Sequence, residues 1–87
     1  MVFFVLTRTG YEELLNRFGK MVPNPLWANK DVFSADELDE MRQQGSEVTN
    51  FTYIVNIQDS VEIAEAVQTI QEHHPGQRVW VEFPTGS

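Results

Sequence analysis

The stretch that decides the fold is Val2-Phe3-Phe4-Val5-Leu6-Thr7. It is a continuous apolar run of β-branched and aromatic residues, without the polar alternation of a strand that faces water on one side. Such a run is typical of a strand buried on both faces, as in a parallel sheet. It is one strand long and has no basic segment before it, so it is too short for a signal peptide or a membrane span. The stretch therefore predicts an α/β protein built around this strand.

Three helices are expected after this strand, because three polar capping patterns follow along the chain. The expected N-caps are Thr9, Ser34 and Asp59, each with a glutamate three residues later at Glu12, Glu37 and Glu62. Apolar residues then recur at helical spacing, at Tyr11, Leu14, Leu15 and Phe18, at Leu38 and Met41, and at Ile63, Val67 and Ile70. Gly19 and Gly45 are placed to end the first two helices, and Pro75-Gly76 follows the third.

Four strands are expected, at residues 2–7, 26–29, 48–57 and 79–83. They begin about 25 residues apart, the length of a compact βαβ unit, and right-handed crossovers make such strands parallel. The sequence thus predicts a small four-stranded, mostly parallel sheet in β-α-β-α-β-α-β order with helices on both faces. We expect a doubly wound strand order such as 2-1-3-4. The segment 26–29 is the shortest strand, and without it the sheet has three strands.

Composition and charge limit the function. The 87 residues fit a single α/β domain over residues 1–84, with a tail at 85–87. The chain carries 13 Asp and Glu against 6 Lys and Arg, a formal net charge of −7, and its basic residues are scattered. Such a chain repels polyanions, so we expect no nucleic acid and no membrane as partner. Without cysteine it has no disulfides and no Cys-type zinc site, and the cytoplasm is the expected location.

A candidate ligand site follows from the expected sheet, because ligands of open α/β sheets bind beyond the carboxyl ends of the strands. Arg8 and Thr9 follow the first strand, Lys30 and Asp31 follow the second, and Glu82 ends the fourth. One hypothesis is an anion or small polar ligand held by the two cations and a helix N-terminus. Another is an acid–base pair of the two carboxylates. The alternative is that these residues are caps, turns and solubilising charges. The loop at 7–10 lacks the glycines of a phosphate-binding loop.

Histidine and tryptophan offer two further signals. His73 and His74 are adjacent, so they point to different sides of a helix and fit one metal ion poorly, even with Glu72 or Glu82. Their other interpretation is a pair that bonds the last carbonyls of the helix. Trp27 and Trp80 fit the core, or a partner surface if one of their strands lies at a sheet edge. No metal, no cofactor and no catalytic residue is predicted.

Two function classes remain open. The first is a small acidic binding or interaction module, homodimeric or regulating a protein partner, which we predict from the acidity, the sheet edges and the lack of a catalytic motif. In this class the acidic surface could also mimic nucleic acid. The second is a small enzyme or a domain that binds an anion or small polar ligand at the carboxyl edge, through the five residues named above. A four-stranded domain forms a concave pocket poorly, which favours the first class.

Overall fold

The computed structural model describes residues 1–17, 19 and 21–82. The expected positions of Phe18 in the first helix, of Phe83 at the end of the last strand, and of the tail at 85–87 lie outside the described residues. Strands and helices alternate along the chain as β1 (Val2–Val5), α1 (Arg8–Arg17), β2 (Leu26–Ala28), α2 (Ala35–Gln43), β3 (Val48–Asn50), α3 (Ser60–His73) and β4 (Val79–Val81). The predicted α/β class is confirmed, and so is the short strand at 26–28.

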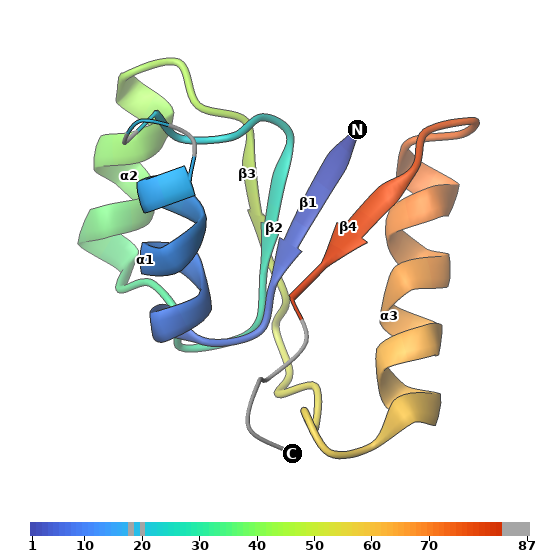
Figure 1. Cartoon of the computed structure of the whole chain (residues 1–87). Helices are drawn as coiled ribbons and strands as arrows, with labels where there is room; N and C mark the ends of the chain where they lie inside the picture. The colour runs from blue at the N-terminus through green and yellow to red at the C-terminus, as the bar shows by residue number, and fades with distance from the viewer. Residues whose placement is uncertain (18, 20, 83–87) are drawn as a thin grey trace.

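The four strands form one parallel sheet in the order β3-β2-β1-β4. Figure 1 shows α1 and α2 on one face of the sheet and α3 on the other. The predicted order 2-1-3-4 is wrong. The second and third strands are added in turn on one side of β1, and only β4 is placed on its other side. The physical reason is that the residues of β2 are all buried, which suits an interior strand, whereas β3 contains the exposed Thr49 and the half-buried Asn50, which suit an edge.

The third strand is also shorter than predicted. It ends at Asn50, and residues 51–57 leave the sheet and cross toward α3. The side chains of this segment differ in burial: Phe51 and Val55 are buried, whereas Tyr53 and Ile54 are exposed. Phe51 and Val55 therefore belong to an apolar core without being part of a strand, so a high β propensity does not by itself indicate one.

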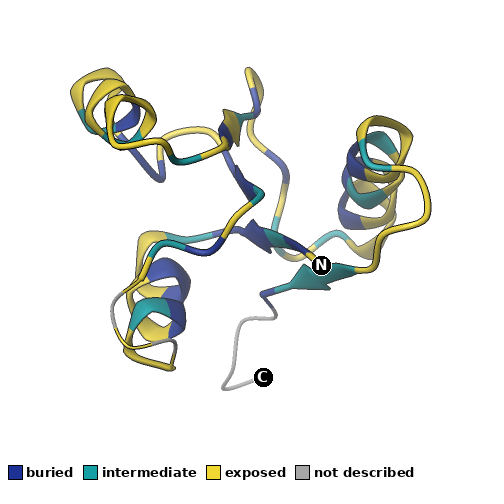
Figure 2. Cartoon of the chain, turned by 90° about the horizontal axis from the view of Figure 1, so that it is seen from above, coloured by how far each residue is buried: buried dark blue, intermediate teal, exposed yellow. Residues whose placement is uncertain are grey.

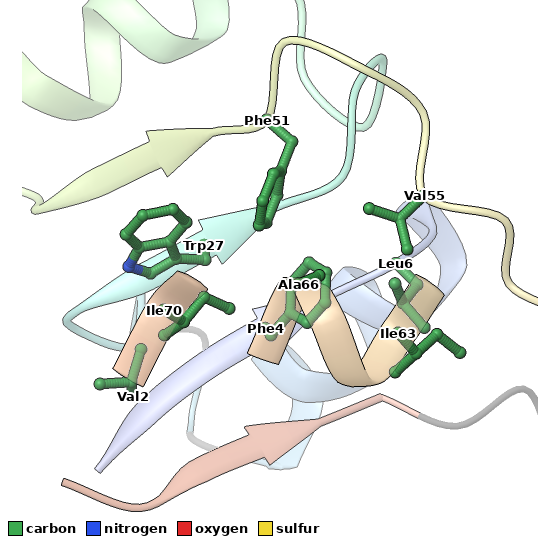
Figure 3. Close-up of a cluster of buried hydrophobic side chains, with 9 residues drawn as sticks. All are labelled: Val2, Phe4, Leu6, Trp27, Phe51, Val55, Ile63, Ala66 and Ile70. Atoms are coloured by element: carbon green, nitrogen blue, oxygen red, sulfur yellow. The ribbon is translucent and has the colours of Figure 1, made fainter. Parts of the chain in front are cut away.

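Each face of the sheet has its own apolar core. On the α1 and α2 face, Val5, Leu26, Ala28 and Val48 of the strands pack with buried residues of both helices. In Figure 2 the residues of the helices that are coloured as buried lie on the sides that face the sheet. The core on the α3 face is drawn in Figure 3 and consists of Val2, Phe4, Leu6, Trp27, Phe51, Val55, Ile63, Ala66 and Ile70. Two cores sharing one buried sheet explain why the run at residues 2–6 has no polar position.

The helix boundaries follow the expected caps with one exception. The capping box of Ser34 with Glu37 is confirmed, and Asp59 caps α3 by accepting from Val61 N and Glu62 N. The exception is α1, which begins at Arg8 and is capped by Thr7, whose Oγ1 accepts from Gly10 N at 3.0 Å. The predicted cap at Thr9 is wrong because the chain turns into the helix directly after β1.

The helix ends and the helix lengths fit the sequence pattern. Gly19 and Gly45 have φ angles of 68° and 90°, the left-handed conformation that glycine adopts at little cost after a helix. Among the described residues, no helix has the length and apolarity required to cross a bilayer.

The capping box of α2 gives a stability prediction. Replacing Ser34 with Ala removes the Oγ that accepts from Glu37 N at 3.1 Å, so the free energy of unfolding should fall by about 0.5–2 kcal/mol in urea denaturation. Ser60→Ala is the matched control, because Ser60 is exposed at the start of α3 and Asp59 already caps that helix. Equal stability of the two variants would contradict the cap.

Candidate functional site

Glu82 lies at the carboxyl edge of the sheet and is almost completely buried, with 8% of its surface exposed. Its Oε1 accepts from Leu6 N at 2.8 Å and from Thr7 N at 2.9 Å, and its Oε2 accepts from the hydroxyl of Thr7 at 2.6 Å. The carboxylate therefore takes the backbone donors that follow β1 and joins the end of β4 to the start of α1.

Glu82 also rests against the backbone of α1. A Cβ atom added at Gly10 would collide with the carboxylate, so only glycine leaves room for it. In sheets whose order begins 3-2-1-4, the strand order reverses between strands 1 and 4, and ligands bind in the crevice at this point. Here the carboxylate of the chain itself lies in this crevice, between the end of β1 and the first turn of α1.

Asn29 closes the neighbouring part of the same edge. It follows β2, is 4% exposed, and donates from Nδ2 to Val55 O at 2.9 Å and to Leu6 O at 3.3 Å. Its Oδ1 accepts from Val55 N at 2.8 Å and from Lys30 N at 2.9 Å. All hydrogen-bonding groups of this side chain are used, which ties the end of β1 to the segment that follows β3.

Arg8 is directed toward α2. Its Nη1 contacts Glu37 Oε2 at 2.6 Å and donates to Val32 O at 3.3 Å, while its guanidinium lies over the rings of Tyr11 and Phe33 at 5.8 and 5.5 Å. The hydrogen bond with Glu37 raises the pKa of Arg8. The hydrogen bond from Ser34 N, followed by that from Arg8, lowers the pKa of Glu37. Arg8 therefore fastens α1 to the start of α2.

The other predicted site residues, Thr9, Lys30 and Asp31, are exposed. Thr9 is in the first turn of α1, and Lys30 and Asp31 lie in the turn after β2, where Asp31 adopts a left-handed φ of 70°. Within the described chain, no hydrogen bond or ion pair joins Arg8, Lys30 or Asp31 to Glu82. Binding of an anion or polar ligand by these residues stays a prediction.

The histidines make contacts at the C-terminal end of α3. Nδ1 of His73 lies 3.1 Å from Thr69 O, and Nε2 of His74 accepts from Trp27 Nε1 at 3.2 Å. The described residues contain no group of three His, Asp or Glu arranged to hold a metal ion. The hydrogen bond between Trp27 and His74 was not predicted from the sequence. The two residues are 47 positions apart, and their proximity can be inferred only from the strand order.

The two edges of the sheet differ. At β3 the outer carbonyl of Val48 accepts from Arg42, whose Nε and Nη2 lie 3.2 and 3.0 Å away. At β4, Val2 N donates to Arg78 O and Glu82 N donates to Phe4 O, so the residues at 78, 80 and 82 direct their bonded groups toward β1. Successive residues of a strand direct their N–H and C=O groups to opposite sides, so those of Val79 and Val81 point away from the sheet. Those outward groups have no hydrogen-bond partner in the described part of the chain. The β4 edge is the more open of the two, because Arg42 occupies one of the outward backbone groups of β3.

An apolar groove lies beside this open edge, between α3 and β4. Its volume is about 330 Å³, and it is lined by Ser60, Ile63, Ala64, Val67 and Val81. Val61 in the same helix is 63% exposed. The helical spacing of Ile63 and Val67 was visible in the sequence, but the groove depends on β4 being at an edge. We refer to the backbone of β4 and these five lining residues as the β4 groove.

Comparison with protein-family models, with curated proteins and with solved structures gave no significant match to the chain.

The contacts of Glu82 give the second prediction. Glu82→Ala leaves two buried or half-buried amides and the Thr7 hydroxyl without their acceptor, so the free energy of unfolding should fall by about 3 kcal/mol. Added formate should restore part of this loss by filling the vacated anion position. Glu82→Gln, which keeps the shape, should lose less.

Chemical denaturation with and without formate measures these effects. Glu72→Ala, an exposed glutamate of α3, should change stability by less than about 0.5 kcal/mol and should not respond to formate. If Glu82→Ala resembles this control, the carboxylate does not hold the edge together.

Proposed function

We propose that this domain is a protein-interaction module that binds an extended segment of a partner protein as an additional strand beside β4. The observation that carries the proposal is the combination of outward-facing, unpaired backbone groups at Val79 and Val81 with an apolar groove directly beside them. In strand addition, main-chain hydrogen bonds supply affinity and adjacent pockets select side chains. Both elements are present in the β4 groove.

The position beyond β4 suits a strand. In doubly wound sheets with the order 3-2-1-4-5, the fifth strand pairs with the fourth on its outer side. A segment bound there would extend the sheet, and its side chains on the α3 face would lie against Ala64 and Val67. The groove thus has the form of a position for one more strand.

The two edges of the sheet are not equivalent for this purpose. Arg42 occupies the outer carbonyl of Val48 in β3, which is one of the ways in which proteins protect an edge from pairing. No side chain among the described residues does the same for β4. We therefore propose the β4 edge, and not the β3 edge, as the binding surface.

A partner protein is favoured over a second copy and over a small polar ligand. Pairing of two β4 edges would bring together two chains that each carry a formal net charge of −7. A small anion would have to displace Glu82, which already accepts from the amides of Leu6 and Thr7 between β1 and α1. An added strand requires neither.

The proposal is tested with peptides selected on the immobilised full chain from a random-peptide phage library. Bound peptides should slow amide hydrogen exchange at Val79 and Val81, because a paired strand covers these outward N–H groups. The outward amide of Asn50 at the β3 edge should exchange as before. Peptides that protect other amides, or failure to select any peptide, would overturn the proposal.

A groove variant provides the matched control. Ala64→Phe fills the groove and should weaken binding of the selected peptides at least about tenfold, as expected when a contact at the centre of an interface is lost. Ala35→Phe places the same side chain on the exposed start of α2 and should leave affinity unchanged. Equal affinity of both variants would argue against the groove. Light scattering should show a monomer, and a dimer disrupted by Ala64→Phe would indicate a second copy as the occupant instead.

A further inference from the structure

We infer that the partner segment is anchored by one large apolar side chain opposite Val81, and that Ala64 of α3 selects the size of this side chain. The inference depends on the proposed strand addition at β4. Leucine, isoleucine, methionine and phenylalanine belong to the class that would fit. The position, the chemistry and the size of the anchor each follow from a different property of the β4 groove.

The position of the anchor follows from the part of β4 that borders the groove. The side chains of Val79 and Val81 both pack on the α3 face, but of these two only Val81 lines the groove. Residues that lie opposite each other on paired strands point to the same face of a sheet. The partner residue opposite Val81 would therefore face the groove. Its two neighbours in the segment would point to the other face of the sheet, where Trp80 packs.

The chemistry of the anchor follows from the lining of the groove. Four of the five lining residues are apolar, namely Ile63, Ala64, Val67 and Val81, and only Ser60 carries a hydroxyl. A charged side chain or an amide seated there would lose water without gaining enough hydrogen-bond partners. An apolar side chain has no such cost, and its burial removes both its own surface and that of the lining from water.

The size of the anchor follows from the volume of the groove. A closed apolar cavity of about 150 Å³ accommodates benzene. The open groove beside β4 measures about 330 Å³. An alanine of the partner would leave most of this space to water against apolar walls, whereas a leucine or phenylalanine would fill far more of it. The groove therefore favours a large side chain over a small one.

Ala64 is the residue that keeps this space free. It is exposed and lies one turn of α3 after Ser60, so two small side chains border the groove on the same side of the helix. Ile63 belongs to the buried core of this face, and Val67 packs against that core. Ala64 is thus the apolar lining residue of α3 that can be enlarged without disturbing the core. A larger side chain at this position would occupy the space that we assign to the anchor.

The test uses synthetic peptides of about seven residues, an ordinary strand length, blocked at both ends. Threonine, which favours strands, fills every position except the central one, where the guest residue is leucine, alanine, glutamate or lysine. Titration followed by NMR gives the affinity, and amide hydrogen exchange at Val79 and Val81 gives the site. We expect the leucine peptide to bind at least about tenfold more tightly than the other three. Nuclear Overhauser contacts of its leucine methyls with those of Ala64 and Val67 should locate the anchor.

Enlarging Ala64 separates the selection of size from a general preference for apolar peptides. In the variant Ala64→Leu the protein fills the groove itself, so the leucine peptide should lose its advantage over the alanine peptide. Ala35→Leu places the same side chain at the exposed start of α2 and should keep the full advantage. Leucine is a good helix former, so both variants should fold. If Ala64→Leu keeps the tenfold preference, Ala64 does not select size and the inference is wrong.

The outcomes distinguish the inference from the proposed function. If the leucine and alanine peptides bind the natural chain equally and both protect Val79 and Val81, strand addition stands and the anchor is wrong. If the leucine peptide binds without protecting these amides, or if no peptide protects them at millimolar concentration, both are wrong.

Discussion

The structure depends on the carboxylate of Glu82 held by the backbone amides that follow β1. A parallel sheet covered on both faces leaves backbone donors at its strand ends, and a buried donor without an acceptor is costly. Among the described residues β4 is the last strand and pairs only with β1, and the side chain that follows β4 supplies the missing acceptor. Gly10 completes the arrangement, because the absence of a Cβ lets the carboxylate reach the first turn of α1. One interaction therefore joins the outermost strand, the central strand and a helix.

Because Glu82 fills its part of the carboxyl edge, we place the proposed interaction at a different surface. The crevice that binds ligands in related strand orders is occupied by Glu82 and, beside it, by Asn29. The same contacts hold β4 in place with its outer backbone groups exposed. Because Arg42 occupies an outward carbonyl of β3 and no described side chain does the same at β4, the β4 groove is the surface on which we place the proposed interaction.

Local signals in the sequence predicted most of the fold. The apolar run at residues 2–7, the box of Ser34 with Glu37 and the cap at Asp59 each act within a few residues, so they can be recognised without knowledge of the tertiary structure. The strand order and the length of β3 depend on long-range packing, and here prediction failed. The contacts of Glu82 join residues 75 and 76 positions apart, and no local pattern marks them. Glu82 was correctly predicted at the carboxyl edge of the sheet, because it comes at the end of a strand. Its role as an acceptor for the amides of Leu6 and Thr7 could not be predicted, because it depends on β1 being the neighbour of β4.

The most direct measurement of the account is the effect of Gly10→Ala on the free energy of unfolding in two backgrounds, the natural sequence and Glu82→Ala. Alanine is favoured over glycine in a helix by up to about 1 kcal/mol. In the natural sequence its Cβ would displace the Glu82 carboxylate, so Gly10→Ala should destabilise the protein despite this preference. In the Glu82→Ala background the obstacle is gone, and the same substitution should stabilise it by about 0.5–1 kcal/mol. The same stabilisation in both backgrounds would contradict the placement of Glu82 against α1, and with it the account of the closed carboxyl edge.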